Sequence, residues 1–117
     1  MNRITEVLVF TLDDQQFALP LEVVERVIRA VAVTPLPSAP ESILGIINMQ
    51  GRILCVLNLR QRCRRPAREV DPDDWFILVH TPSRTVVLPV DSARVTRCDP
   101  GRTLPSGFWR RALGRVH

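Results

Sequence analysis

The sequence predicts an all-β, mainly β fold, because its apolar residues form short runs that are rich in β-branched side chains and separated by turn residues. Two stretches carry this prediction. Residues 43–59 contain two apolar runs on either side of Asn48-Met49-Gln50-Gly51, and residues 75–90 contain two more across Pro82-Ser83-Arg84. Each stretch has the pattern of a β-hairpin. A chain of 117 residues is expected to form one domain with a small core.

A first hairpin is expected near the N-terminus. Glu6 to Leu12 is rich in β-branched and aromatic residues and predicts a strand. Phe17 to Leu19 predicts the short return strand, across a turn at Asp13 to Gln16. This second strand should end at Pro20, which has no backbone N–H to donate.

The next stretch, Leu21 to Val33, carries two conflicting patterns. Its valines and isoleucine recur at helical spacing, whereas its density of β-branched residues favours a strand. We expect a turn of helix near Leu21 to Glu25 that leads into a strand from Arg26 to Val31. Thr34 to Pro40 then contains three prolines, which predict an extended connection between strands.

The hairpin at 43–59 is expected at the centre of the fold, because both of its arms are almost continuously apolar and such strands are usually covered on both faces. Gly45 within the first arm indicates a bulge, a barrel corner or a close approach of another backbone. Gly51 can adopt the positive φ that a tight turn needs. The turn would present Asn48, Met49 and Gln50 on a rigid support.

Arg60 to Asp74 is predicted to be a polar loop, long for a compact domain. It contains five arginines, at positions 60, 62, 64, 65 and 68, followed by four acidic residues at 69, 71, 73 and 74. These neighbouring opposite charges are expected to solvate the loop and partly neutralise each other. Strands are then expected at Trp75 to Thr81 and Thr85 to Val90.

The order of several motifs resembles the CheW-like chemotaxis coupling proteins between Val7 and Val95. The motifs are Val27-Ile28-Arg29, Thr34-Pro35-Leu36-Pro37, the stretch Gly45 to Gly51, and Asn58-Leu59. The resemblance implies a pair of small SH3-like five-stranded barrels. It also implies a non-catalytic adaptor that couples transmembrane, methyl-accepting chemoreceptors to a CheA-type histidine kinase.

The resemblance also indicates which residues would bind partners, and these lie on the predicted strand at 26–31 and on the central hairpin. They are Arg26, Val27, Gly45, Asn48, Met49, Gln50 and Gly51. The family has a basic residue where this chain has Gln50, and often an acidic residue where it has Arg26. An alternative interpretation is that Asn48 to Gly51 only forms a turn.

The charge is concentrated towards the C-terminus. Up to Ala93 there are ten arginines and eleven acidic residues, whereas from Arg94 onward there are six arginines and only Asp99. We expect residues 1–97 to form the CheW-like domain and 98–117 a basic C-terminal tail, truncated relative to the family. The second barrel would then be incomplete, and its open strand edge could support self-association.

Catalysis, cofactors and metals are not expected. The sequence lacks a glycine-rich phosphate loop, a Gly-x-Ser-x-Gly elbow and paired histidine ligands. Cys55, Cys63 and Cys98 lack zinc-site spacing, and Cys55 is expected to be a small buried apolar residue. His80 is interpreted as a partly buried or edge histidine, not as a base or a ligand.

The alternatives to an adaptor are a small basic β-barrel that binds nucleic acid and a degenerate or regulatory CheW-like protein. Arginine-rich tails bind phosphate backbones without sequence specificity, but few aromatic residues remain for base stacking, so no specific nucleic-acid partner is expected. No long apolar run or leader is present. We therefore expect a cytoplasmic protein that meets the membrane only through receptors.

Overall fold

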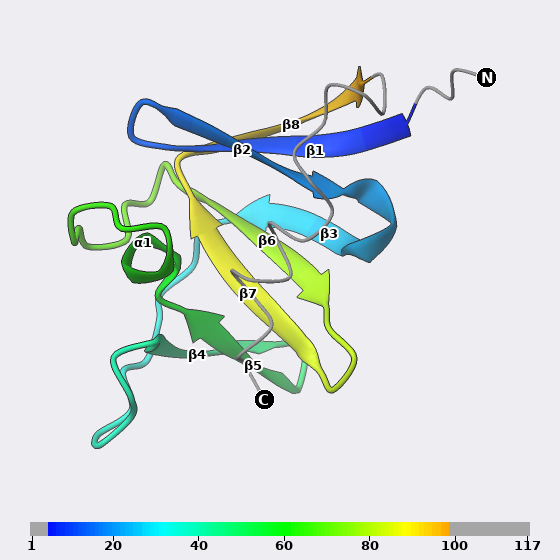
Figure 1. Ribbon diagram of the computed structural model, residues 1–117. Coiled ribbons are helices and arrows are strands. Elements are labelled where there is room, and N and C mark those ends of the chain that lie inside the picture. Colours follow the sequence, from blue (N-terminus) through cyan, green and yellow to red (C-terminus); the bar gives the residue numbers. More distant parts are fainter. Residues whose placement is uncertain (1–4, 99–117) are drawn as a thin grey trace.

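The computed structural model describes residues 5–98, which form two β-sheets and two short helical turns (Figure 1). The strands are β1 (Thr5–Leu12), β2 (Gln15–Pro20), β3 (Val24–Arg29), β4 (Ile43–Met49), β5 (Arg52–Leu57), β6 (Trp75–His80), β7 (Thr85–Val90) and β8 (Ser92–Cys98). The helical turns are the 3₁₀ helix η1 (Leu21–Val23) and the α-helix α1 (Leu59–Arg62). The all-β prediction is confirmed.

The first sheet has three strands in the order β2-β1-β8. The predicted N-terminal hairpin is confirmed, since β1 and β2 pair in antiparallel register from Val7–Pro20 to Leu12–Gln15. Strand β8 was not predicted. It pairs with β1 over its whole length, although Arg94 and Arg97 interrupt any apolar pattern.

The second sheet has five strands in the order β3-β6-β7-β5-β4. The helical turn and strand expected after Pro20 are present as η1 and β3. Beyond β3 the chain curls back to β4, where Thr34 and Ile46 exchange two backbone hydrogen bonds of 2.9 Å. The connection that follows β3 is therefore bonded to β4, and this contact closes the sheet into a small barrel.

The predicted hairpin of β4 and β5 is confirmed, but its expected central position is wrong. Strands β6 and β7 occupy the middle of the sheet and are buried on both faces. Strand β4 is instead an outer strand, and Ile53 on β5 is 60% exposed. The continuous apolar run misled because the three-stranded sheet does not cover the outer face of the hairpin near its tip.

Two clusters of buried side chains form the core. The larger lies between the sheets and contains Leu8, Phe10, Leu12, Phe17, Leu19, Leu57, Leu59, Ile77, Val79, Val86, Leu88 and Val90. The smaller lies within the barrel and contains Ile47, Leu54, Val56, Phe76, Leu78 and Val87. Successive residues of β6 alternate between the two clusters, so this strand joins them.

A group of ion pairs, called here the Asp91 cluster, fixes the loop after α1 to the junction of the sheets. Arg60 bonds to Asp13 in the β1–β2 turn at 3.0 Å and to Asp91 between β7 and β8 at 2.8 Å. The Asp13 amide donates to Asp91 Oδ2 at 2.6 Å. Arg68 pairs with Asp91 and with Asp74.

Neighbouring charges of this loop were expected from the sequence to partly neutralise each other, and most of these contacts differ from that expectation. Of the ion pairs described here, only that between Arg68 and Asp74 joins an arginine and an acid of this loop. Arg60 and Arg65 bind aspartates that are distant in the sequence. Burial of Arg60 between the sheets requires carboxylates that the loop itself does not place there.

Candidate functional site

The β4–β5 turn is built to hold an unusual backbone conformation. Gln50 has a φ of 53° and Gly51 a φ of 88°, as in the type I′ turns that match the twist of a hairpin. Asn48 Oδ1 accepts a hydrogen bond of 3.0 Å from the Gly51 amide. The last pair of the ladder is Met49 with Arg52. The tip is therefore fixed by its own residues.

A second set of contacts ties this hairpin to the opposite side of the barrel. Arg52 at the start of β5 forms two hydrogen bonds with Glu25 on β3, of 2.8 and 3.4 Å. Thr85 on β7 donates to Glu25 Oε1 at 3.4 Å, and His80 Nε2 on β6 lies 3.5 Å from the same oxygen. Residues from four strands thus meet at Glu25.

The carboxylate of Glu25 is held in its charged form. The hydrogen bond from Arg52 lowers its pKa, an effect that outweighs the opposing influence of burial. The charge of Arg52 and the hydrogen bond from Thr85 lower the pKa of Glu25 further. The bond to Arg52 is charge-assisted on both sides and connects β3 to the hairpin.

The structure brings together four of the predicted site residues at the hairpin tip. Asn48, Gln50 and Gly51 are exposed, whereas Met49 is half-buried and packs against the barrel core. Their exposed atoms are available to a partner. The tip is therefore a rigid, mostly polar projection.

The two predicted residues on β3 lie on different sides of that strand. Arg26 is exposed and lies opposite Leu78 of β6, whereas Val27 is half-buried and packs against the larger core. The residue before Arg26 is Glu25, whose bond to Arg52 connects this strand to the hairpin. The structure thus links β3 and the tip through Glu25.

Gly45 is buried and lies away from the exposed tip. The pairing of β4 with β5 shifts register between Ile43 and Gly45, which is the bulge that the sequence indicated. A Cβ atom on Gly45 would lie 2.2 Å from the carbonyl oxygen of Thr34. The close backbone approach that closes the barrel therefore requires glycine here.

Sequence reasoning missed Glu25, Arg52 and Thr85 as parts of this site. Glu25 and Arg52 are 27 residues apart, and Glu25 and Thr85 are 60 residues apart. The sequence predicts Glu25 at the end of a helical turn, where burial of its carboxylate is not expected. A half-buried carboxylate needs a base nearby, but which base it meets depends on how the barrel closes, and no local pattern in the sequence indicates it.

The structure also places the cysteines and the histidine that the sequence analysis considered as reactive or metal-binding groups. Cys55 and Cys63 are half-buried against the larger core, and burial raises the pKa of both thiols. His80 lies at the exposed end of β6. Within residues 5–98, no group of three or more histidine, cysteine or acidic side chains could hold a metal ion. No helix in that range is long and apolar enough to cross a membrane.

Comparisons with known proteins give a consistent result. Residues 6–106 match the model of the CheW-like domain family. The chain is 31% identical over 87 residues to a chemotaxis protein CheW of Rhizobium meliloti, covering 74% of this chain and 56% of that protein. It is 41% identical over 54 residues to a chemotaxis protein CheW of Thermotoga maritima, covering 46% and 36% of the two chains.

A solved structure is also similar over most of the fold. The scaffolding protein TtCheW from Thermoanaerobacter tengcongensis superposes with a TM-score of 0.77 at 30% sequence identity. The match covers 85% of this chain and 68% of that protein. The chain spans about half, or less, of the length of the sequence relatives it matches.

Proposed function

Because the chain belongs to the CheW-like domain family, we propose that it is a non-catalytic chemotaxis adaptor that couples transmembrane chemoreceptors to a CheA-type histidine kinase. The family match over residues 6–106 and the likeness to a scaffolding protein support this role. Its place of action would be the cytoplasm, with the receptors providing contact with the membrane. Its mechanism is positional: it alters kinase output by holding partners together.

We further propose that the hairpin tip is the main contact with the kinase or receptor. The observation that carries this proposal is the fixed tip conformation, held by the bond from the Gly51 amide to Asn48 and by the ion pair between Arg52 and Glu25. A surface that is already ordered loses little conformational entropy on binding. Such a tip suits an adaptor.

The remaining predicted residues have different roles in this proposal. Arg26 on β3 adds an exposed charge beside Glu25. Val27 and Gly45 act indirectly, since Val27 packs against the core and Gly45 allows the barrel to close. Their substitution would weaken binding by shifting the tip.

The test is the affinity of the purified chain for a purified CheA-type kinase from the source cell. The family resemblance places a basic residue at position 50, so Gln50→Arg should tighten binding by adding a charge-assisted hydrogen bond, worth about 1 kcal/mol more than a neutral one. Isothermal titration calorimetry would measure the change. An unchanged affinity would remove Gln50 from the surface that contacts the kinase.

The matched control is Gln16→Arg, which adds the same charge on the exposed face of β2 in the other sheet. Its affinity for the kinase should equal that of the parent chain. Equal tightening by both substitutions would indicate general electrostatic attraction, and the tip would then have no special role.

The alternative of nucleic-acid binding is less well supported by the described surface. Arg60, Arg65 and Arg68 are engaged by aspartates, so they do not offer free positive charge to phosphates. Self-association through an open strand edge stays a prediction. In the described range the outer strands of the three-stranded sheet are β2 and β8.

A further inference from the structure

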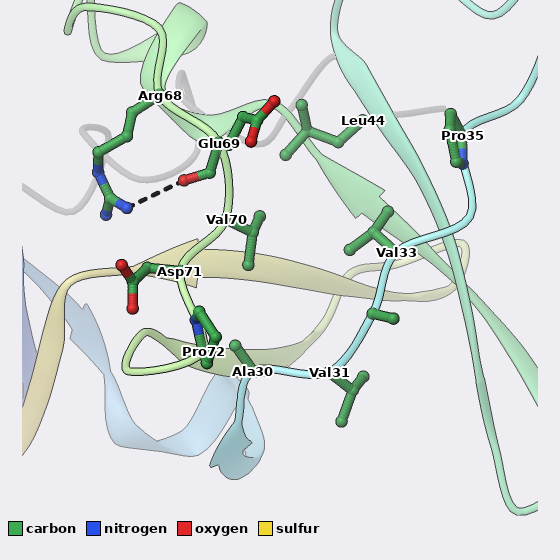
Figure 2. Close-up of a pocket in the computed structure, with 11 residues that line it drawn as sticks. Ala30, Val31, Val33, Pro35, Leu44, Arg68, Glu69, Val70, Asp71 and Pro72 are labelled. Atoms are coloured by element: carbon green, nitrogen blue, oxygen red, sulfur yellow. Dashed lines mark hydrogen bonds between the residues drawn. The ribbon is translucent and has the colours of Figure 1, made fainter.

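A groove lies between the connection from β3 to β4 and the loop that follows α1. Its volume is about 540 Å³, and its lining includes Val31, Val33 and Leu44 on one side and Val70 on the other (Figure 2). Val33, Leu44 and Val70 pack against the barrel core. Val31 is 46% exposed, and Leu36 on the same connection is 41% exposed. The groove therefore exposes apolar surface.

One rim of the groove is acidic. Glu69 and Asp71 line it, and Asp73 follows on the same exposed loop. Among the described residues, none of these three carboxylates has an ion pair with a base. The nearby Arg68 is held by Asp74 and Asp91. The groove is thus suited to a segment with apolar side chains and net positive charge.

A segment of this composition is present in the chain itself. Residues 107–117 follow the part that matches the family. They contain four large apolar residues and three arginines, with no acidic residue: Phe108, Trp109, Leu113, Val116, Arg110, Arg111 and Arg115. We propose that the groove binds residues 107–117 of the same chain, with their apolar side chains against Val31 and Leu44 and an arginine beside Glu69.

The proposed occupant is covalently connected to the described fold. Trp109 is 11 residues beyond Cys98, which ends β8. An extended chain of that length reaches about 36 Å. Tethering gives an effective concentration in the millimolar range, so even weak complementarity would keep the groove occupied. This occupant goes beyond the adaptor role, and its binding does not involve the hairpin tip.

The experiment measures the solvent exposure of Trp109 in the full chain. The chain has two tryptophans, so Trp75→Phe leaves Trp109 as the only indole. Acrylamide quenching should then be weaker for the protein than for a synthetic peptide of residues 107–117. In that background, Val31→Arg should abolish this protection, and Glu69→Arg should reduce it. Circular dichroism verifies that each variant is folded.

The matched control is Ile53→Arg, which places the same charge on an exposed apolar residue of β5 that does not line the groove. It should leave the quenching of Trp109 unchanged, and dilution should also have no effect. The proposal would be overturned if acrylamide quenched Trp109 in the Trp75→Phe chain as strongly as in the free peptide. So would protection that survives Val31→Arg and Glu69→Arg, or protection lost on dilution, which would make a second copy the occupant.

Discussion

The guanidinium of Arg60 lies between two carboxylates that the fold brings together from the β1–β2 turn and the β7–β8 junction. Its side chain is 10% exposed, compared with 33% for Asp13 and 27% for Asp91. Because water still reaches the carboxylates, removing the arginine should cost less than breaking a fully buried pair. We expect Arg60→Met to lower the free energy of unfolding by about 2 kcal/mol.

Urea unfolding followed by circular dichroism would measure this loss. The control is Arg64→Met on the same loop, where the arginine is exposed and has no ion pair within the described residues. It should change stability by less than about 0.5 kcal/mol. Equal effects of the two substitutions would show that the Asp91 cluster contributes nothing beyond general charge.

The ion pairs of Arg60 could not be predicted from the sequence. The sequence shows the arginines of the loop, but the partners of Arg60 lie 47 and 31 residues away in the chain. No local pattern connects them, because their proximity depends on the docking of one sheet on the other. Gly45 is the contrasting example, since a glycine within an apolar strand by itself indicated a bulge, a barrel corner or a close backbone approach, and the structure has both the bulge and the close approach.

At the scale of elements, the β4–β5 hairpin contains two glycines that are needed for different reasons. A Cβ on Gly45 would clash with the Thr34 carbonyl, whereas a Cβ on Gly51 would meet nothing within 4 Å. Gly51 is required only for its φ of 88°. We therefore expect Gly45→Ala to cost about 3 kcal/mol by forcing apart the barrel closure, and Gly51→Ala about 1 kcal/mol.

Thermal and urea unfolding of the two variants would test this ranking, with each variant serving as the control for the other. Amide hydrogen exchange adds a more specific readout. Gly45→Ala should speed exchange of the Thr34 and Ile46 amides, which form the closing bridge. The interpretation fails if Gly51→Ala is the more destabilising change, or if the bridge amides stay as protected as in the parent.

Elements formed by neighbouring segments were the most predictable. The hairpins β1–β2, β4–β5 and β6–β7 each combine two apolar runs with turn residues between them, so the sequence pattern locates them. Strand β8 was missed because its pairing with β1 spans the whole described fold, and because arginines interrupt its short apolar pattern, in which Val95 is itself exposed. The short helix α1 left one signal, Asn58, whose side chain accepts from the Gln61 amide as an N-cap.

At the scale of the whole molecule, the two sheets are held by apolar packing and by the Asp91 cluster. The hydrogen bond from Arg60 lowers the pKa of Asp13, an effect that burial opposes and Arg65 reinforces. Burial would raise the pKa of Asp91, but the Asp13 amide together with Arg68 and Arg60 outweighs it, so this pKa is also lowered. The docking of the sheets should therefore depend on pH.

The direction of that dependence follows from the lowered pKa values. A carboxylate whose folded pKa lies below its unfolded value, about 3.9 for aspartate, contributes stability above pH 4 that is lost as the pH falls through the folded pKa. We expect the free energy of unfolding to be steady near pH 6 and to decrease below about pH 4.

Asp91→Asn should lower stability at pH 6 and also flatten this decrease, since position 91 can then no longer release a proton on folding. Urea unfolding at a series of pH values between 6 and 3 would measure both effects. A variant that loses as much stability on acidification as the parent would mean that other carboxylates with lowered pKa values, Asp13 or Glu25, cause the acid sensitivity, and that Asp91 does not.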